Sequence, residues 1–161
     1  MENSVENRSA GRASLLTLAL FIVVVLGVGI AIGFATPPGE WYRALEKPVF
    51  NPPNWLFGPV WTAIYILIAV AGWRIYCRAP KSQAMTMWFA QLALNWAWSP
   101  VFFGLEAIWP AFIVIVALWI SIVAFIIRAK EIDGVATILF MPYLAWVSFA
   151  LVLNLAIGIL N

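Results

Sequence analysis

Ala13 to Ala35 reads ASLLTLALFIVVVLGVGIAIGFA, a run of mostly apolar residues without a charged side chain. The hydrocarbon core of a bilayer is roughly 30 Å thick, and a helix needs about 20 apolar residues to cross it. The run is also longer than the apolar stretch of about 7 to 15 residues in a secretory signal peptide. We therefore predict a membrane span that the mature protein keeps.

Four more apolar runs follow, and the expected spans are residues 55–77, 83–103, 108–127 and 135–158. Hydrophobic residues make up 65% of the 161 residues and charged residues 10%, and the mean hydropathy is +0.97. These values leave too few polar side chains for a soluble surface. Because the later links are short, consecutive helices should be antiparallel neighbours. The sequence predicts an all-α integral membrane bundle of five transmembrane helices with up-down topology.

The distribution of positive charge predicts the orientation of this bundle. Residues 1–12 form a polar tail before the transmembrane domain, residues 13–161, and only Arg43 and Lys47 lie on the side of the first loop. The other basic residues occupy the tail and the second and fourth loops: Arg8, Arg12, Arg74, Arg78, Lys81, Arg128 and Lys130. The positive-inside rule places the N-terminus in the cytoplasm and the first loop and C-terminus on the opposite side. A scattered net charge of +2 does not favour a nucleic-acid partner.

The first loop, residues 36–54, is long for so small a protein and carries proline clusters at both ends. Between these clusters, residues 40–46 can form one or two helical turns. Long ordered loops in compact proteins usually serve a function. We therefore expect this loop to take part in the functional site.

Several kinds of enzyme chemistry lack their residue types in this chain. It has no histidine and a single cysteine, Cys77, so the usual zinc sites, haem ligands and nucleophile–histidine pairs are not available. The carboxylates Glu106, Glu131 and Asp133 fall in short loops, where we expect solvated charges. We predict no metal site, no resident cofactor and no acid–base pair.

Ten tryptophans stand out, and their depth separates them into two groups. Trp55, Trp73, Trp88 and Trp109 lie at predicted span ends, as expected of an interfacial belt. Inside a span, an indole N–H or an amide needs a partner that hydrocarbon does not supply. With a rise of about 1.5 Å per residue, a mixed polar and aromatic set falls in the outer half of the spans, beneath the first loop: Trp61, Asn95, Ser99, Trp146 and Asn154.

Two helical stripes carry these groups. The third span presents Trp88, Gln91, Asn95 and Phe102, and the fifth presents Tyr143, Trp146, Ala150 and Asn154. Pro100 and Pro142 free backbone carbonyls beside the stripes and can widen the bundle there. The amides either hold helices together through hydrogen bonds or line a small-molecule cavity with aromatic walls. Their convergence at one depth favours the cavity.

The first span contains the pattern GxxxG at residues 29–33. Two glycines four residues apart allow a neighbouring helix to approach closely. The partner helix belongs either to the same bundle or to a second copy of the chain, and the pattern does not choose between these alternatives.

Several ordered motifs resemble the translocator protein (TspO/MBR) family, also called tryptophan-rich sensory proteins or peripheral-type benzodiazepine receptors. They are WY at 41–42, LEKP at 45–48, NPPNW at 51–55, GPVW at 58–61, QLALNWAWSPVFFG at 91–104 and PYLAW at 142–146. The resemblance covers nearly all of the chain after the tail. It implies a five-helix membrane protein, often dimeric, that binds porphyrins, cholesterol and synthetic ligands in a pocket beneath the first loop.

The resemblance also implies roles for particular residues. Trp61 and Trp146 match the family's pocket tryptophans, Asn95 matches its third-helix amide, and Trp41 and Tyr42 match the loop residues that cover the site. The expected ligand-binding residues are Trp41, Tyr42, Trp61, Tyr65, Asn95, Trp98, Ser99, Tyr143, Trp146 and Ala150. The chain departs from the animal proteins at the end of the fifth span, where Leu155 and Ile159 replace the tyrosine and arginine of the cholesterol motif. Sterol binding at that motif is therefore not implied.

These features together predict a membrane receptor, sensor or transporter that binds porphyrin-type tetrapyrroles, with Arg43 or Lys47 pairing with the propionates. The bound molecule would be a porphyrin or haem-like ligand, or else a sterol or lipid, and a homodimer is expected. One alternative is a light-dependent, protoporphyrin-degrading enzyme in which Trp61 and Trp146 are the redox-active candidates. The other is a regulatory interaction protein with a lipid-filled pocket.

Overall fold

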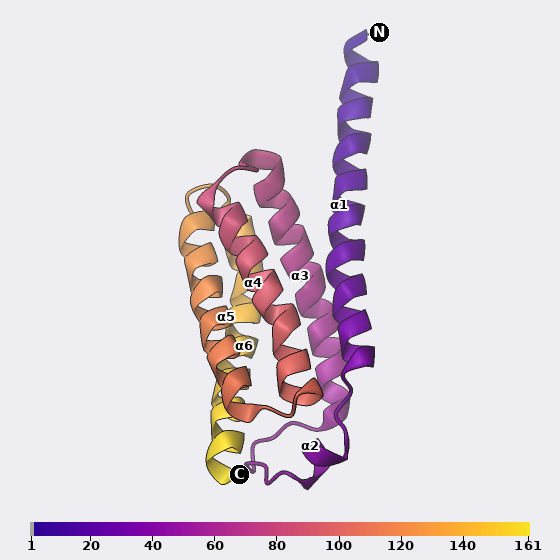
Figure 1. Ribbon diagram of the computed structural model, residues 1–161. Coiled ribbons are helices and arrows are strands. Elements are labelled where there is room, and N and C mark those ends of the chain that lie inside the picture. The colour runs from indigo at the N-terminus through magenta and orange to yellow at the C-terminus, as the bar shows by residue number, and fades with distance from the viewer. Residues whose placement is uncertain (1) are drawn as a thin grey trace.

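The computed structural model describes residues 2–161, with side chains from Ser14 onward, and this part of the chain is helical without a β-strand. Four helices are long and apolar enough to cross a membrane: α1 (Glu2–Ala35, apolar over Ser14–Ala35), α3 (Phe57–Arg78), α5 (Ile108–Ala129) and α6 (Gly134–Leu160). Because α1 begins at Glu2, residues 2–12 of the predicted tail continue the first span as one helix (Figure 1). Met1 and the side chains of Arg8 and Arg12 lie outside the described part.

The predicted third span is divided into two kinds of helix. The α-helix α4 (Gln83–Ser99) begins where the Ser82 side chain accepts a hydrogen bond from the amide of Met85. Pro100 cannot continue the α-helical ladder, and the chain rewinds into a π-helical turn, η2 (Pro100–Gly104), in which the amide of Leu105 donates to the carbonyl of Pro100. With 17 residues, α4 is shorter than the other long helices, so length and composition alone mark four spans instead of five.

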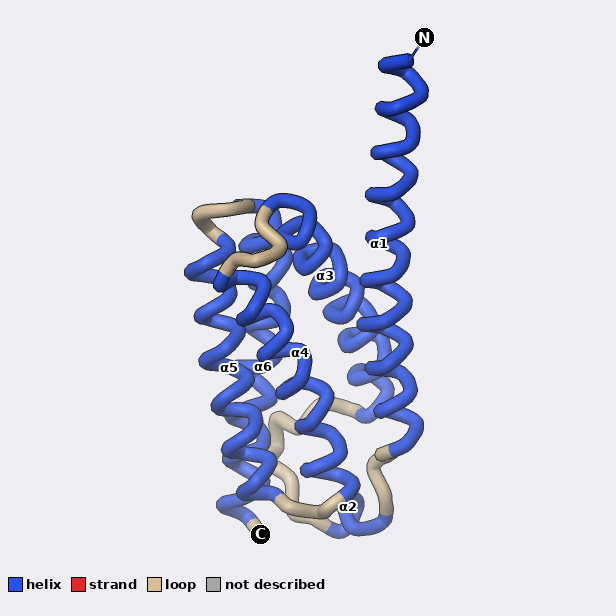
Figure 2. The backbone as a smooth tube through the Cα atoms, turned by 45° about the horizontal axis from the view of Figure 1, so that its top comes forward, coloured by secondary structure: helices blue, strands red, loops and turns tan. Residues whose placement is uncertain are grey.

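The long helices alternate in direction, as expected for an up-down bundle (Figures 1 and 2). The backbones of α3 and α4, although joined by a short turn, lie farther apart than those of the other consecutive pairs of long helices. The main contacts pair α1 with α3, α3 with α6, α6 with α5 and α5 with α4. The helices α3 and α4 meet through side chains instead, as the hydrogen bonds from Trp88 to Ile68 and from Tyr65 to Asn95 show.

The Trp88 side chain fills the space between α3 and α4. It is 3% exposed, its Nε1–H donates to the carbonyl of Ile68 at 2.9 Å, and its ring lies 5.2 Å from that of Phe21 on α1. Gly72 on α3 makes room for the indole, because a Cβ atom at that position would overlap the Trp88 ring. The prediction that Trp88 belongs to an interfacial belt is wrong, whereas Trp55 and Trp109 are exposed as a belt requires.

An ion-pair cluster joins the end of α3 to the start of α6, far from the first loop. Asp133 accepts hydrogen bonds from Arg74 at 2.8 and 3.1 Å, contacts Arg78 at 2.9 Å and caps α6 by accepting from the amides of Val135 and Ala136. Its side chain is 3% exposed. The prediction that Asp133 is a solvated loop charge is therefore wrong, because two arginines on α3 reach this loop.

These contacts change the pKa of the Asp133 carboxyl. Burial acts to raise its pKa, but the hydrogen bonds from Arg74 and the two α6 amides, together with the positive charge of Arg74, outweigh burial and hold the pKa below its ordinary value. A lowered folded-state pKa means that the unfolded chain binds this proton more readily than the folded chain. The resulting stability is present above the ordinary pKa of the carboxyl and is lost as the pH falls through the lowered one.

We expect Asp133→Asn to lower the free energy of unfolding by about 1 to 2 kcal/mol at pH 7, because the amide keeps a capping oxygen but loses the ion pairs. The difference from wild type should shrink as the pH is lowered from 5 toward 2, because the wild-type carboxyl then takes up a proton. Thermal unfolding of the purified proteins in detergent across this range measures the effect. A difference that does not change with pH would contradict the ion-pair explanation.

Candidate ligand-binding cavity

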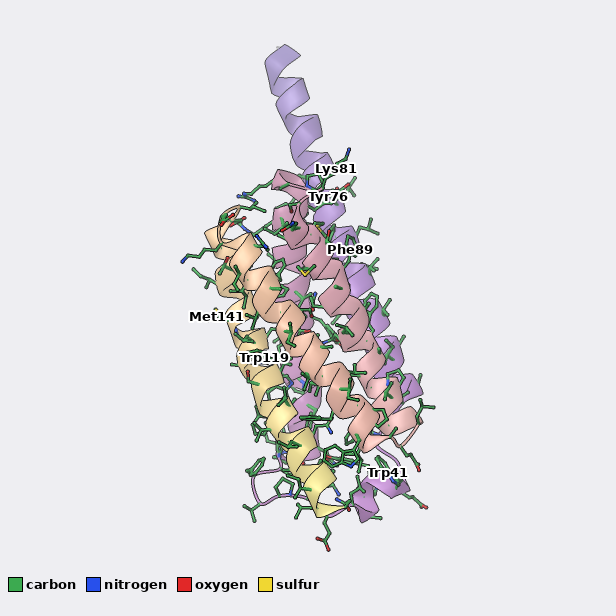
Figure 3. All side chains as sticks on the ribbon, turned by 60° about the vertical axis from the view of Figure 1, so that its left-hand side comes forward. Trp41, Tyr76, Lys81, Phe89, Trp119 and Met141 are labelled. Atoms are coloured by element: carbon green, nitrogen blue, oxygen red, sulfur yellow. The ribbon has the colours of Figure 1, made fainter. Side chains whose placement is uncertain are left out.

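A half-open cavity of about 390 Å³ lies beneath the first loop, between α1, α3 and α4. Residues 36–54, which include the short helix α2 (Glu40–Ala44), cover its end, and we call them the lid. Figure 3 shows Trp41 on α2 at this end of the molecule and Lys81 at the other. The wall consists of Gly29, Ile30, Ile32, Gly33, Phe34, Thr36, Pro38, Tyr42, Asn54, Phe57, Gly58, Trp61, Thr62, Tyr65, Asn95, Trp98, Ser99 and Phe103.

Aromatic rings form much of this wall. The ring centroids of Trp61 and Tyr65, one turn apart on α3, lie 5.4 Å from each other. On the α4 side, Trp98 stacks on Phe102 at 5.1 Å and meets Phe103 edge-on at 5.8 Å. Flat aromatic faces with few polar groups between them suit a flat apolar ligand.

The lid is held closed by contacts at two points. Tyr42 is 5% exposed and packs edge-on against Phe102 and Phe103, while its hydroxyl donates to Asn51 within the lid. Burial raises the pKa of the Tyr42 phenol, which therefore stays protonated as this donor. The side chain of Asn161, after the end of α6, accepts from the amide of Glu46 and donates to its carbonyl, both at 3.0 Å.

A chain of hydrogen bonds leads from the cavity into the helix bundle. The Tyr65 hydroxyl donates to Asn95 Oδ1 at 3.1 Å, and Asn95 Nδ2 donates to the Tyr143 hydroxyl at 2.9 Å. Tyr143 donates to Gln91 Oε1 at 3.0 Å, and Gln91 Nε2 donates to the carbonyl of Trp88 at 2.8 Å. This network satisfies the polar groups of three helices in an apolar interior.

Six of the ten expected ligand-binding residues line the cavity: Tyr42, Trp61, Tyr65, Asn95, Trp98 and Ser99. Tyr143 is fully buried behind the wall, where it bonds to Asn95 and packs edge-on against Trp61. Trp146 lies behind the wall residue Phe57, at 5.8 Å between ring centroids, with its Nε1 buried and without a partner among the described residues. Trp41 packs on Phe102, and Ala150 packs against the core, so neither lines the cavity.

The two cations expected to pair with propionates lie on the lid and not on the cavity wall. Arg43 is exposed, at the end of α2. Lys47 Nζ donates to the carbonyls of Arg43 and Leu45 and lies 4.6 Å from the centre of the Tyr42 ring. Both charges are therefore near the covered end of the cavity, outside it.

Some wall residues were not predicted from the sequence. Thr36, at the end of α1, contacts the Ser99 hydroxyl at 2.8 Å and so joins α1 to α4. Phe57 and Phe103 carried no signal that distinguished them from other apolar residues of a span. Gly29 carried the GxxxG signal, and it lies against Tyr65 of α3, whose ring a Cβ atom would overlap. For Gly29, packing within the bundle is therefore the correct alternative.

Comparisons with known proteins agree with this arrangement. The family model described as "TspO/MBR family" matches residues 21–160. The chain is 40% identical over 156 residues to "Tryptophan-rich protein TspO" of Chlorobaculum tepidum, covering 91% of this chain and 97% of that protein. It is 35% identical over 152 residues to "Protein CrtK" of Rhodobacter capsulatus (92% and 94% covered), and 30% identical over 144 residues to the human "Translocator protein" (84% and 85%). Together with its long apolar helices, these matches show that the chain belongs to the TspO/MBR family of membrane proteins.

Proposed function

We propose that the protein crosses the membrane five times and binds a porphyrin-type tetrapyrrole, or a similarly flat hydrophobic ligand, in the cavity beneath the lid. The third span in chain order, which α4 alone is too short to form, is α4 continued by η2, residues 83–104; together they are long enough to cross the hydrocarbon core. The alternating directions of the helices support this count, because α4 runs between the same two ends as its neighbours (Figure 1).

The orientation follows from the charged end of the bundle. Of the basic residues with described side chains, Arg74, Arg78, Lys81, Arg128 and Lys130 lie at the end opposite the lid, at or just beyond the ends of helices. The positive-inside rule makes that end cytoplasmic. In this orientation the lid and Asn161 face the opposite side of the membrane.

The cavity is the observation that supports the ligand class. Its volume of about 390 Å³ lies within the range of roughly 300 to 1,000 Å³ of small-molecule sites. Indole and phenyl faces at Trp61, Trp98 and Phe103 can stack on a flat ring system. Gly33, Phe34, Gly58 and Thr62 on its rim are exposed, so an extended ligand can project beyond the cavity. A receptor, sensor or transporter of such a ligand fits this design.

The direct test is a titration of the purified protein with protoporphyrin IX in the dark, followed by quenching of tryptophan fluorescence. Wild-type protein should show saturable quenching. Trp61→Phe should raise the dissociation constant about three- to fivefold, because the variant keeps an aromatic ring but loses contact area and the indole N–H.

Trp109→Phe is the matched control, because Trp109 is exposed at the same end of the bundle but does not line the cavity. Its dissociation constant should equal that of the wild type. If wild-type protein shows no saturable quenching, the tetrapyrrole proposal is wrong and a lipid-filled pocket becomes the better explanation. Equal losses in the two variants would place the ligand elsewhere.

The photochemical alternative depends on an indole close to the bound pigment. Trp61 lies on the wall, whereas Trp146 is separated from the cavity by Phe57. Of these two candidates, Trp61 would therefore be oxidised by the excited pigment before Trp146. Illumination of the bound complex, with mass analysis of the pigment, distinguishes degradation from binding: equal bleaching by wild type and Trp61→Phe would remove any role for this residue.

A further inference from the structure

The hydrogen bonds around the cavity have fixed directions, and one buried residue determines those of the deepest network. The carbonyl of Trp88 can only accept, so the side-chain end of Gln91 that contacts it must be the NH2 group. Gln91 Oε1 then points at Tyr143 and can only accept its proton. Because the Tyr143 proton is used in this way, its oxygen accepts from Asn95 Nδ2.

The same reasoning reaches the cavity wall. With Nδ2 directed at Tyr143, Asn95 presents Oδ1 to Tyr65, and the Tyr65 hydroxyl must donate to it. Both residues line the cavity, but Asn95 is only 5% exposed, so Tyr65 is the more exposed member of this network. Its proton is turned inward, and only its lone pairs remain for a ligand.

The other hydroxyl groups on the wall also donate their protons to acceptors within the protein. Thr62 donates to the carbonyl of Gly58, and Thr36 donates to the carbonyl of Ile32, both at 2.9 Å. Since the proton of Thr36 is used, Ser99 is the donor in the 2.8 Å contact between these two hydroxyls. Tyr42 donates to Asn51. Each of these hydroxyls therefore has only lone pairs left for a ligand.

We propose that Gln91, which is fully buried and does not line the cavity, fixes the direction of the Tyr65 hydroxyl on its wall, so that the preferred ligand presents an N–H or O–H donor to Tyr65. This inference rests on the proposed ligand-binding role of the cavity and specifies its chemistry. A flat ring with an N–H group satisfies the wall without disturbing a protein hydrogen bond. A ligand carbonyl at the same place meets the lone pairs of Tyr65 and gains no hydrogen bond from this residue unless Tyr65 gives up its bond to Asn95.

Three probes of nearly identical shape separate these cases: carbazole with an N–H donor, fluorene with a CH2 group, and fluorenone with a C=O acceptor. Calorimetric titration of the purified full chain in detergent gives the three dissociation constants. Wild-type protein should prefer carbazole to fluorene by about three- to tenfold, the effect of one net hydrogen bond. Each dissociation constant is corrected for the measured partitioning of that probe into protein-free micelles, and the corrected ratios are compared between wild type and variants.

Gln91→Met tests the relay itself, because methionine fills a similar volume but accepts only weakly and donates nothing. The Tyr143 hydroxyl is then free to donate to Asn95, whose amide can turn over and donate to Tyr65. Tyr65 would now direct its own proton into the cavity. The variant should lose the carbazole preference and bind fluorenone about three- to tenfold better relative to fluorene than wild type does.

Two further variants complete the test. Tyr65→Phe removes the acceptor and should bring the carbazole-to-fluorene ratio close to one, even if Gln91→Met does not fold. Trp109→Phe changes an exposed residue outside the cavity, and it should leave that ratio unchanged. No carbazole preference in wild type, or the same preference in Tyr65→Phe, would overturn the inference. Protoporphyrin binding is measured separately. A protein that prefers carbazole but does not bind protoporphyrin would contradict the proposed tetrapyrrole ligand and leave this inference intact.

Discussion

Replacing Gly72 with alanine should lower the free energy of unfolding by about 3 kcal/mol, from overpacking together with a lost buried hydrogen bond. The new methyl group would overlap the indole of Trp88, which is 3% exposed and has no open space to move into. Displacing the ring also breaks its bond to the carbonyl of Ile68 and its contact with Phe21. Because the indole fills the space between α3 and α4, the loss should affect the whole bundle.

Gly58→Ala is the control on the same helix, because a Cβ atom there meets nothing within 4 Å. Alanine is a better helix former than glycine, so this variant should be as stable as wild type or slightly more stable. Thermal unfolding in detergent, followed by circular dichroism, measures both. Equal unfolding midpoints for Gly72→Ala and Gly58→Ala would show that the Trp88 site can expand, contrary to this explanation.

Gly29→Ala should weaken protoporphyrin binding about tenfold to a hundredfold, as expected when overpacking moves a wall residue. The methyl group would overlap the ring of Tyr65, the residue that joins the cavity wall to Asn95. The ring must shift into the cavity, or α1 must move away from α3, and either change alters the wall. Fluorescence quenching in the dark gives the dissociation constant.

Gly27→Ala adds the same methyl group to the same helix, two residues away, where nothing lies within 4 Å. It should bind protoporphyrin as wild type does. The comparison therefore separates the shape of the cavity from the general effect of replacing a glycine in α1. Equal affinities for Gly29→Ala and Gly27→Ala would mean that the ligand does not contact this part of the wall.

The position of the cavity followed from the sequence, whereas its boundary did not. Depth along the helices placed Trp61, Asn95 and Ser99 beneath the first loop, and all three line the cavity. Trp146 lies at a similar depth but on a helix face that Phe57 covers. Depth depends only on the rise per residue, but facing depends on the rotation of each helix against its neighbours, which packing sets.

The charged residues of the fourth loop give a second example of what the sequence predicts and what only packing decides. The sequence placed Glu131 and Asp133 together in a short loop, where Asp133 precedes a helix and can cap it, but nothing local predicts that its side chain is buried. Glu131 is exposed, whereas Asp133 is buried against Arg74, a residue 59 positions earlier in the chain. Only the packing of α3 against α6 brings these two residues together.

The sequence by itself determined the helical fold, most of the helix boundaries and the alternating directions, because apolar run length and breaker residues act locally along the chain. The tertiary structure decided which helices are neighbours, which side chains face the cavity and the direction of each hydrogen bond on its wall. The reason is physical: Trp88 separates α3 from α4, and Gln91 sets the orientation of Tyr65 through two residues on different helices. Such relations exist only after the helices have packed.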